Sequence, residues 1–317
     1  MIDIVLHYNV SSRLIEHLHQ LRAEGLAVEV CDEADDHRFF DLMSNAQVLW
    51  HSLRPVTREV IARAPRLRLI QKIGVGVNTI DLEAARERGI AVCNMPGSNS
   101  NAVAEMTLLL MLATLRRLPL FDRRVRSGNQ WATDAALTDQ LSELRGRKVG
   151  LVGFGAIPTV LAPILAALGA DVSYTSRARK PGASVPYQPL DDLLADSDIV
   201  SLHLPLVPET THIIDASALA RMKPGAILIN TARGGLVDEN ALIAALTAGH
   251  LAGAGLDVLA HEPPPANHPL FKMDNVILAP HVAWLTRETL DRSLRIALEN
   301  CRRLAGGEKL LHQVVPQ

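Results

Sequence analysis

We predict an α/β protein of two domains, each built on a parallel β-sheet. Three observations lead to this prediction. At 317 residues the chain is long enough for two hydrophobic cores. Short apolar, largely β-branched runs alternate with helical segments along both halves of the chain. A glycine turn, Gly153-Phe154-Gly155, stands between a predicted strand and a predicted helix near the middle.

The composition excludes several classes of protein. Hydrophobic residues make up 48% of the chain and charged residues 21%, which is typical of a globular protein without disordered bias. The net charge of −2 gives no reason to expect a nucleic acid or an anionic membrane as partner. The three cysteines lack the spacing of metal ligands, so we expect no metal and no disulfide framework.

From the start of the sequence we expect no targeting signal. The first ten residues are typical of a strand rather than of a signal peptide. The longest apolar run, 106–115, is too short to span a bilayer. We therefore expect a cytoplasmic protein.

The first hundred residues predict a small parallel α/β domain. Its strands are expected at Ile2–Leu6, Ala27–Val30, Gln47–Trp50, Leu67–Ile73 and Ile90–Cys93. After the fourth strand, Gly74-Val75-Gly76 leaves the backbone N–H groups of Val75 and Gly76 accessible to an anion such as a carboxylate. A tight turn without a ligand is the alternative. His51, Ser52 and Arg54 also follow a strand, either as lining of the same crevice or as ordinary loop residues.

The middle of the chain begins with a linker. Residues 94–99 are dense in turn formers. A helix is predicted from Asn101 through 118, apolar on most of its faces and therefore buried. The stretch from Arg116 to Trp131 is polar, and we predict it to be irregular.

The stretch from Lys148 to Arg179 is typical of a dinucleotide-binding unit. A strand at 149–152, the glycine turn, an apolar helix to Leu168 and a strand at 171–175 follow within about 30 residues. Gly153 permits the turn, Gly155 lets the backbone approach a pyrophosphate, and the helix N-terminus attracts that anion. Pro158 replaces the third glycine, which loosens the packing of helix on strand, and a second proline at 163 is expected to kink the helix. The same fold without a ligand is the alternative.

Three polar side chains follow the later strands, which are expected at Ile199–Leu204, Ala226–Asn230, Gly255–Val258 and Val276–Leu278. Arg233, Glu262 and His281 come just after the ends of three of them. The carboxyl ends of parallel strands lie at one edge of a sheet, so these side chains are expected to converge there. Arginine pairs with a carboxylate, histidine exchanges a proton near neutral pH, and glutamate orients the imidazole.

The end of the second strand of the glycine-rich unit predicts the cofactor. An NAD-specific unit places a carboxylate about 20 residues after its first glycine, to bind the ribose hydroxyls. Ser176 stands there instead and Arg177 follows, so no carboxylate repels a 2′-phosphate. A serine hydroxyl and a guanidinium both suit phosphate. We predict a preference for NADP(H), with NAD(H) as the second possibility; Arg179 and Lys180 are either further phosphate ligands or a solvated loop.

Taken together, these motifs resemble the D-isomer-specific 2-hydroxyacid dehydrogenases. The residues that carry the resemblance are Gly74-Val75-Gly76, Gly153 and Gly155, Asn230 to Glu239 (NTARGGLVDE), Glu262-Pro263 and Pro280-His281-Val282-Ala283-Trp284. They occur in the family's order and cover nearly the whole chain. The resemblance implies two Rossmann-like or flavodoxin-like domains with the active site in the cleft between them. The substrate-binding domain would be 1–98 with 286–317, and the dinucleotide-binding domain 99–285.

The resemblance also implies roles for individual residues. Arg233 would bind the substrate carboxylate and polarise its carbonyl, and His281 would be the general acid in reduction, supported by Glu262. Substrate contacts would come from Val75, Gly76, Arg233, His281 and Trp284. Cofactor contacts would come from Gly153, Phe154, Gly155, Ala156, Ile157, Ser176, Arg177, Thr231, Ala232 and Asp257, the last orienting the nicotinamide. The apolar helix and the arm that ends at Trp131 would form the contact of a homodimer.

The family contains more than one activity. Trp284 after the histidine resembles hydroxypyruvate and glyoxylate reductases, which reduce small polar 2-keto acids reversibly. Phosphoglycerate dehydrogenases tend to have arginine where His51 aligns, which disfavours a phosphorylated substrate. Formate and phosphite dehydrogenases differ around the first glycine loop. The alternative is a dinucleotide-binding, corepressor-like sensor without turnover, but such proteins usually carry long tails, whereas this chain ends at Gln317.

Overall fold

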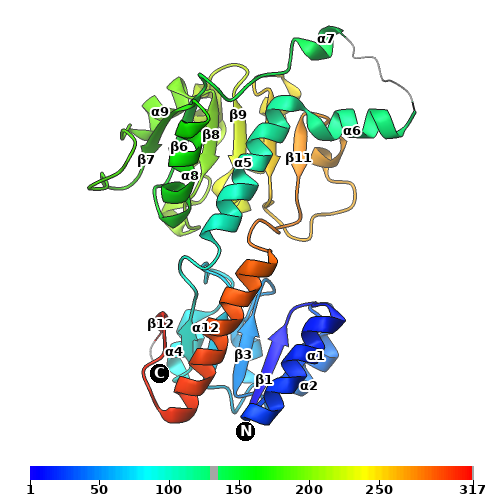
Figure 1. Ribbon diagram of the computed structural model, residues 1–317, viewed down its shortest axis with the longest axis vertical. Coiled ribbons are helices and arrows are strands. Elements are labelled where there is room, and N and C mark those ends of the chain that lie inside the picture. The colour runs from blue at the N-terminus through cyan, green and yellow to red at the C-terminus, as the bar shows by residue number, and fades with distance from the viewer. Residues whose placement is uncertain (129–134, 316–317) are drawn as a thin grey trace. The chain divides into compact units, whose positions relative to one another are not determined.

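The computed structural model describes residues 1–128 and 135–315, which form two compact units (Figure 1). The first unit consists of Met1–Asn99 and Thr286–Gln317, and the second of Ser100–Leu285. Each contains one six-stranded sheet with helices on it, which confirms the predicted fold class. The ligand that we assigned to each domain stays a prediction.

The sheet of the first unit has the strand order β12-β5-β4-β3-β1-β2. Its strands are β1 (Ile2–His7), β2 (Leu26–Cys31), β3 (Val48–His51), β4 (Leu69–Lys72), β5 (Ala91–Cys93) and β12 (Gln313–Val315). The first five strands are parallel, as predicted. Strand β12 was not predicted; it adds to the edge antiparallel to β5, and three residues are too few for a periodic signal.

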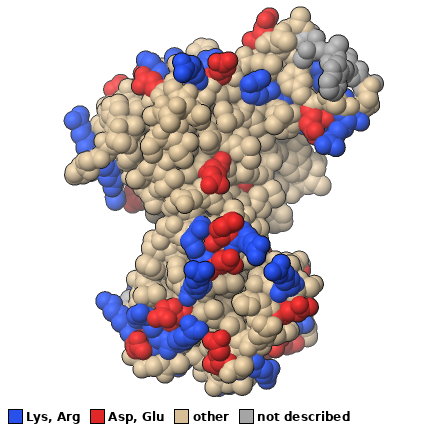
Figure 2. Space-filling model, viewed as in Figure 1, with Lys and Arg blue, Asp and Glu red and all other residues tan. Residues whose placement is uncertain are grey.

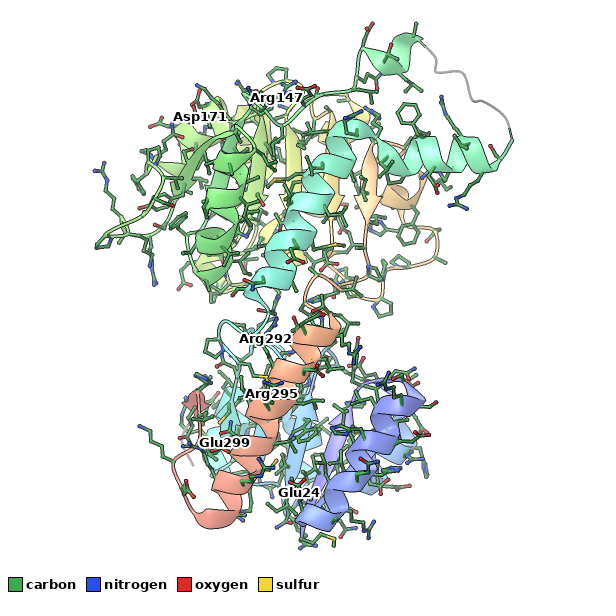
Figure 3. All side chains as sticks on the ribbon, in the orientation of Figure 1. Glu24, Arg147, Asp171, Arg292, Arg295 and Glu299 are labelled. Atoms are coloured by element: carbon green, nitrogen blue, oxygen red, sulfur yellow. The ribbon has the colours of Figure 1, made fainter. Side chains whose placement is uncertain are left out.

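Helices cover both faces of this sheet. They are α1 (Ser12–Gln20), η1 (Leu21–Glu24), α2 (Asp36–Met43), α3 (Arg58–Ala62), α4 (Leu82–Glu87) and α12 (Arg287–Gly306). Helices α2 to α4 pack on the face that carries Leu49 and Ile70. Helix α12 covers the opposite face, where Asn300 Nδ2 donates to Gln71 Oε1 at 2.6 Å. Figure 3 labels Arg292 on α12, whose Nε donates to the Ser98 carbonyl at 2.8 Å.

The sheet of the second unit is parallel throughout, with the strand order β11-β10-β9-β8-β6-β7. Its strands are β6 (Lys148–Val152), β7 (Asp171–Thr175), β8 (Ile199–Leu202), β9 (Ile227–Asn230), β10 (Gly253–Leu256) and β11 (Val276–Leu278). A parallel bridge between Tyr174 and Tyr187 continues the sheet beyond β7. The chain reverses its direction of winding between β6 and β8, and in open α/β sheets ligands bind at such a point.

Helices also cover both faces of the second sheet. The helices of this unit are α5 (Ser100–Arg116), α6 (Leu118–Arg126), α7 (Ala135–Thr138), α8 (Ala156–Ala167), α9 (Leu190–Asp196), η2 (Pro208–Thr210), α10 (Ala216–Arg221), η3 (Gly234–Leu236), α11 (Glu239–Thr247) and η4 (Pro269–Lys272). One core lies between the sheet and α5 and α8, and the other between the sheet and α9 to α11. Helix α8 continues past Pro163 to Ala167.

The prediction of an irregular segment after the apolar helix is wrong for Leu118–Arg126, which forms α6. Arg117 adopts a left-handed conformation with φ of 47° and so ends α5. Pro119 then stands in the first turn of α6, where its missing N–H breaks no helical hydrogen bond. Trp131, the end of the predicted arm, lies outside the described residues.

Among residues 1–128 and 135–315, no helix combines the length and the apolar character that crossing a membrane requires.

Candidate active site

The glycine turn after β6 has the conformation that both glycines were predicted to allow. Gly153 has a φ of +99°, and a Cβ there would lie 2.6 Å from the His203 carbonyl oxygen. Its N–H donates to the Thr175 carbonyl at 2.9 Å, which fixes the turn to the end of β7. Gly155 caps α8, and a Cβ there would meet nothing within 4 Å. The residues therefore fit a dinucleotide, because a phosphate could approach this backbone closely.

The residues around the glycines differ in what they offer a ligand. Ala156 and Ile157 open α8, where backbone N–H groups lack helical partners. Pro158 follows in the same first turn and is buried. Phe154 is only 9% exposed and its ring packs on Tyr174 with centroids 4.3 Å apart, so its side chain belongs to the core. A contact from Phe154 to a ligand would have to come from its backbone.

The loop after β7 presents cations. Figure 2 shows Lys and Arg side chains at the edge of the second unit beyond β7, and Arg177, Arg179 and Lys180 of this loop are all exposed. Arg179 lies over the Tyr187 ring, 5.1 Å from its centroid. The Ser176 hydroxyl donates to the Ala178 carbonyl at 2.6 Å, so Ser176 would have to exchange this bond for one to a ligand.

Arg233 is held in a turn that Asn230 organises at the end of β9. The Asn230 side chain is buried; its Oδ1 accepts from the Ala232 N–H at 3.0 Å and its Nδ2 donates to the Arg233 carbonyl at 2.9 Å. Thr231 is fixed separately, because its hydroxyl lies 2.8 Å from that of Thr107 on α5. The Arg233 guanidinium donates through Nη1 to the Ala232 carbonyl at 2.6 Å.

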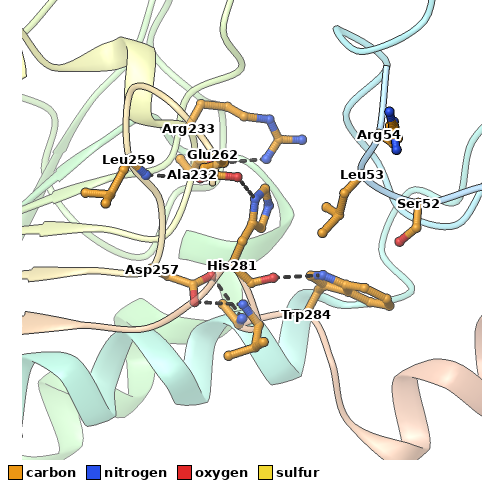
Figure 4. Close-up of polar contacts among 12 residues, drawn as sticks. Ser52, Leu53, Arg54, Ala232, Arg233, Asp257, Leu259, Glu262, His281 and Trp284 are labelled. Carbon is orange, nitrogen blue, oxygen red and sulfur yellow. Dashed lines mark hydrogen bonds and ion pairs between the residues drawn. The ribbon is translucent and has the colours of Figure 1, made fainter. Parts of the chain in front are cut away.

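His281 and Glu262 form a hydrogen-bonded pair (Figure 4). His281 Nδ1 lies 2.6 Å from Glu262 Oε2, and the other carboxylate oxygen accepts from the Leu259 N–H at 3.0 Å. An ionised carboxylate only accepts, so Nδ1 carries the hydrogen and Nε2 remains for exchange with a ligand. Burial raises the pKa of the Glu262 carboxyl, but the hydrogen bond and charge of His281, the Leu259 N–H and the charge of Arg233 together lower it below its ordinary value.

The backbone around His281 is held by Asp257 and Trp284. His281 has a left-handed φ of 55°, which is uncommon for a residue with a side chain. Its N–H donates to the Asp257 carbonyl at 2.7 Å, and the two carboxylate oxygens of Asp257 accept from the N–H groups of Val282 and Ala283 at 2.8 and 2.9 Å. Trp284 Nε1 donates to the His281 carbonyl at 3.1 Å. These bonds stabilise the strained turn that aims the imidazole.

Asp257 therefore contributes to the site through the backbone of this turn. Burial raises the pKa of the Asp257 carboxyl, although the N–H groups of Ala283 and Val282 and the charge of His281 oppose this. Trp284 is similarly internal, with 8% of its surface exposed. The nicotinamide and substrate contacts predicted for these two residues would have to be made in addition to the bonds described.

The charges of the cluster are partly desolvated. Burial lowers the pKa of the Arg233 guanidinium from its ordinary value, and the charge of Glu262 opposes that shift. A guanidinium that is partly removed from water attracts a carboxylate more strongly than a fully solvated one does. Arg233, Glu262 and His281 thus bring together a cation that can pair with an anion and an imidazole whose orientation Glu262 holds.

The predicted residues of the first unit lie at the end of β3, where His51 is the last residue of the strand, and in the loops after β3 and β4. The Val75 side chain is 41% exposed, and its carbonyl accepts from Asn94 Nδ2 at 2.9 Å. His51 is fully buried, with Nε2 2.8 Å from the Thr79 hydroxyl, so it packs inside the unit rather than on its surface. Arg54 pairs with Asp36 at 2.6 Å and donates to the Glu33 carbonyl. Both residues are already engaged by their own unit.

Our sequence analysis missed residues that hold the site from behind. Thr107 on α5 bonds to Thr231 after β9, and Glu239 on α11 bonds to Ala260 and to His268, which precedes η4. Glu239 ends the motif Asn230 to Glu239, and Thr107 is a hydroxyl within a largely apolar helix, so both had a signal. For His268 the sequence contains none that we recognise.

Comparison with known proteins identifies a matching family and several related proteins. Residues 108–283 match the family described as D-isomer specific 2-hydroxyacid dehydrogenase, NAD binding domain. A glyoxylate reductase of Aeropyrum pernix is 41% identical over 300 residues, which are 91% of this chain and 90% of that protein. A D-3-phosphoglycerate dehydrogenase of Mycobacterium tuberculosis is 42% identical over 265 residues, 82% of this chain. The chain spans about half the length of that relative, with 49% of it covered.

A solved structure has the same fold as this chain. The NADPH-dependent glyoxylate/hydroxypyruvate reductase of Sinorhizobium meliloti, in complex with NADP and malonate, superposes with a TM-score of 0.83 at 29% identity. The match covers 98% of this chain and 96% of that one. On the matched family domain, the near full-length relative and the shared two-unit architecture, the chain belongs to the D-isomer-specific 2-hydroxyacid dehydrogenase family.

Proposed function

We propose that the chain reduces a small 2-keto acid of the glyoxylate or hydroxypyruvate class to the D-2-hydroxy acid, reversibly and with NADPH in preference to NADH. The observation that carries this proposal is the pairing of His281 Nδ1 with Glu262 Oε2 at 2.6 Å beside the partly desolvated Arg233. Such a group binds an α-keto carboxylate and supplies one proton. The glyoxylate reductase of Aeropyrum pernix supports the substrate class.

The proposed mechanism divides the chemistry between the protein and its cofactor. A bound nicotinamide supplies the hydride. Arg233 holds the substrate carboxylate in a planar fork, with the N–H groups of Val75 and Gly76 as further proposed ligands. Protonated His281 donates from Nε2 to the alkoxide that develops at the carbonyl oxygen, while Glu262 holds the ring through Nδ1. Asp257 and Trp284 keep the His281 backbone in place.

We propose that Gly153, Gly155, Ala156 and Ile157 hold the pyrophosphate of the cofactor, with Phe154 contributing its backbone. Ser176 and Arg177 would hold the 2′-phosphate. Support for NADPH comes from the missing carboxylate at the end of β7 and from the exposed cations after it. The relative from Sinorhizobium meliloti is named NADPH-dependent and carries NADP. Thr231 and Ala232 would line the nicotinamide side of the same sheet edge.

Steady-state assays of the purified chain test the proposal. We expect turnover of glyoxylate and hydroxypyruvate with NADPH, slower turnover of pyruvate, and none of 3-phosphohydroxypyruvate. A panel of 2-keto acids with both cofactors gives kcat/KM for each pair. Efficient turnover restricted to the phosphorylated substrate would overturn the substrate class. Nucleotide binding without turnover of any keto acid would favour the non-enzymatic sensor.

We also propose a homodimer formed through the second unit, in a cytoplasmic setting. Leu109 and Leu112 of α5 and Leu118 of α6 are exposed on this unit, as apolar residues of an interface would be in a single subunit. All three cysteines are buried free thiols, which suits a reducing compartment. Light scattering at micromolar concentration measures the mass, and a monomer would contradict the dimer.

A further inference from the structure

We infer that Glu239 is a positioning residue, which holds the loop bearing Glu262 so that the Glu262–His281 pair forms. This inference rests on the proposed function, because the pair it concerns is the proposed proton-transfer group. Glu239 is the first residue of α11 and stands six residues after Arg233. We call residues 259–268, which contain Glu262, the Glu262 loop.

The carboxylate of Glu239 bonds to the Glu262 loop at both of its ends. Oε2 accepts from the Ala260 N–H at 3.0 Å, and Oε1 lies 3.0 Å from His268 Nε2. Since a carboxylate only accepts, His268 Nε2 is the donor. The side chains of Glu239 and His268 are only 18% and 9% exposed, so water cannot readily replace either bond. One rigid helix end thus fixes the start and the end of the loop.

The two carboxylates divide consecutive backbone donors between them. The Leu259 N–H donates to Glu262 Oε1 and the next N–H, that of Ala260, donates to Glu239 Oε2, each at 3.0 Å. The two N–H groups belong to adjacent peptide groups that meet at the Cα of Leu259, so a change in the backbone of Leu259 affects both bonds. If Glu239 releases Ala260, the Leu259–Ala260 turn can rotate, and the bond that aims Glu262 at His281 is weakened.

Backbone packing joins the same turn to Arg233. A Cβ added to Gly234 would lie 1.9 Å from the Leu259 carbonyl oxygen and 2.5 Å from the Ala260 nitrogen. The turn after Arg233 and the start of the Glu262 loop are therefore in direct backbone contact, which only glycine permits. Arg233 and Glu239 stand at the two ends of the same short segment. By bonding to the Glu262 loop, Glu239 therefore fixes the position of that loop relative to the turn that carries Arg233.

A kinetic comparison tests this role with Glu239→Gln. The amide can accept one of the two hydrogen bonds but presents N–H₂ to the other donor, so one bond is lost. We expect kcat for reduction to fall by roughly tenfold or more, as misplacement of a reacting group does. The Kd for NADPH, measured by fluorescence titration, should stay within about twofold, because no proposed cofactor ligand changes. Asp191→Asn is the matched control, since it removes a carboxylate in the first turn of α9 and its 3.1 Å ion pair with Arg221 on α10.

The pH profile separates positioning from a general loss of stability. The charged groups around His281 are Glu262, Asp257 and Arg233, and behind them Glu239 and His268. A displaced Glu262 stabilises the imidazolium less, so the fall of kcat/KM with rising pH should move to lower pH in Glu239→Gln. It should not move in Asp191→Asn. A profile and a kcat that match those of the control would overturn the inference.

Two further measurements still test the role of Glu239 if Glu239→Gln folds poorly or if the chain has no turnover. His268→Gln keeps a donor near the position of Nε2, whereas His268→Leu removes it and also removes a buried Nδ1 for which the described residues offer no partner. We expect the leucine variant, and not the glutamine variant, to reproduce the loss. The ¹⁵N NMR titration of His281 needs no substrate: its midpoint should shift to lower pH in His268→Leu and Glu239→Gln. An unshifted midpoint in both would refute the role of Glu239, and absent turnover in the unmodified chain would refute only the proposed function.

Discussion

His281 Nδ1 lies 2.6 Å from Glu262 Oε2, and this single contact decides which nitrogen of the imidazole can react. The carboxylate accepts a hydrogen bond from Nδ1–H, which leaves Nε2 as the atom that donates to or accepts from a ligand. The backbone of His281 is left-handed, and it is held by the hydrogen bonds that the Asp257 carboxylate accepts from the N–H groups of Val282 and Ala283. This backbone fixes the direction of the ring.

Removal of the imidazole should abolish most of the proton transfer. We expect His281→Gln to lower kcat for keto-acid reduction by about 10²-fold or more, the usual contribution of general acid catalysis. The Kd for NADPH should barely change, because His281 is not a proposed cofactor ligand. Near-normal turnover in this variant would remove His281 from the mechanism.

Removal of the negative charge beside the imidazole should have a milder effect and a distinct pH signature. Glu262→Gln keeps the shape of the side chain but no longer compensates an imidazolium. We expect the fall of kcat/KM for reduction with rising pH to move to lower pH. At low pH the unmodified protein should retain the pair, since the pKa of Glu262 is below its ordinary value. Superimposable pH profiles would count against this role of Glu262.

The guanidinium of Arg233 should be sensitive to a change that keeps its charge. Arg233→Lys loses the planar fork that matches a carboxylate. We expect a higher KM for the keto acid together with a lower kcat, because binding and orientation of the carbonyl are lost at once. An unchanged KM in steady-state assays would show that Arg233 is not the carboxylate ligand.

The preference for NADPH should depend on Arg177. A charged hydrogen bond to the 2′-phosphate contributes about 1.5–3 kcal/mol, or roughly 10–150-fold in affinity. Arg177→Ala should raise KM for NADPH by a factor in this range and leave KM for NADH nearly unchanged. Arg179→Ala is the comparison within the same loop, since Arg179 lies over the Tyr187 ring. Equal or better efficiency with NADH in the unmodified chain would refute the assignment.

A buried histidine in the first unit should make stability depend on pH. Burial, aided by the charge of Arg54, lowers the pKa of His7 from its ordinary value of 6.5 to about 4. Between these values the unfolded chain binds a proton that the folded chain does not, so stability falls as pH falls from 6.5 towards 4. Between pH 7 and pH 5 the titration of His7 should lower the free energy of unfolding by about 2 kcal/mol.

The variant His7→Phe isolates this contribution. It preserves a ring to stack on Phe39, where the His7 centroid lies 3.8 Å away, but it cannot titrate. Urea unfolding at pH 7 and pH 5 should show a smaller loss of the free energy of unfolding in the variant than in the unmodified protein. The same loss in both proteins would contradict a depressed pKa for His7.

Much of the architecture was predictable from the chain alone. Apolar runs report burial, and glycines report turns, so the parallel strands β1 to β11 and the position of Arg233, Glu262 and His281 after strand ends followed from local patterns. Helix α6 was missed because its sequence is polar, and its start depends on one backbone conformation at Arg117. Strand β12 was missed because its three residues are too few to show an alternating pattern, and it forms a strand only by pairing with β5.

Local patterns in the chain were therefore enough to predict the order of the strands and the residues that follow each strand end. The bonds between atoms became visible only in the folded chain. They are those of His281 Nδ1 with Glu262, of the Asp257 carboxylate with the N–H groups of Val282 and Ala283, and of Glu239 with both ends of the Glu262 loop. Periodicity could not predict them, because it records only which side chains are buried. The direction of a side chain instead depends on loop backbones that settle only when distant segments pack against each other.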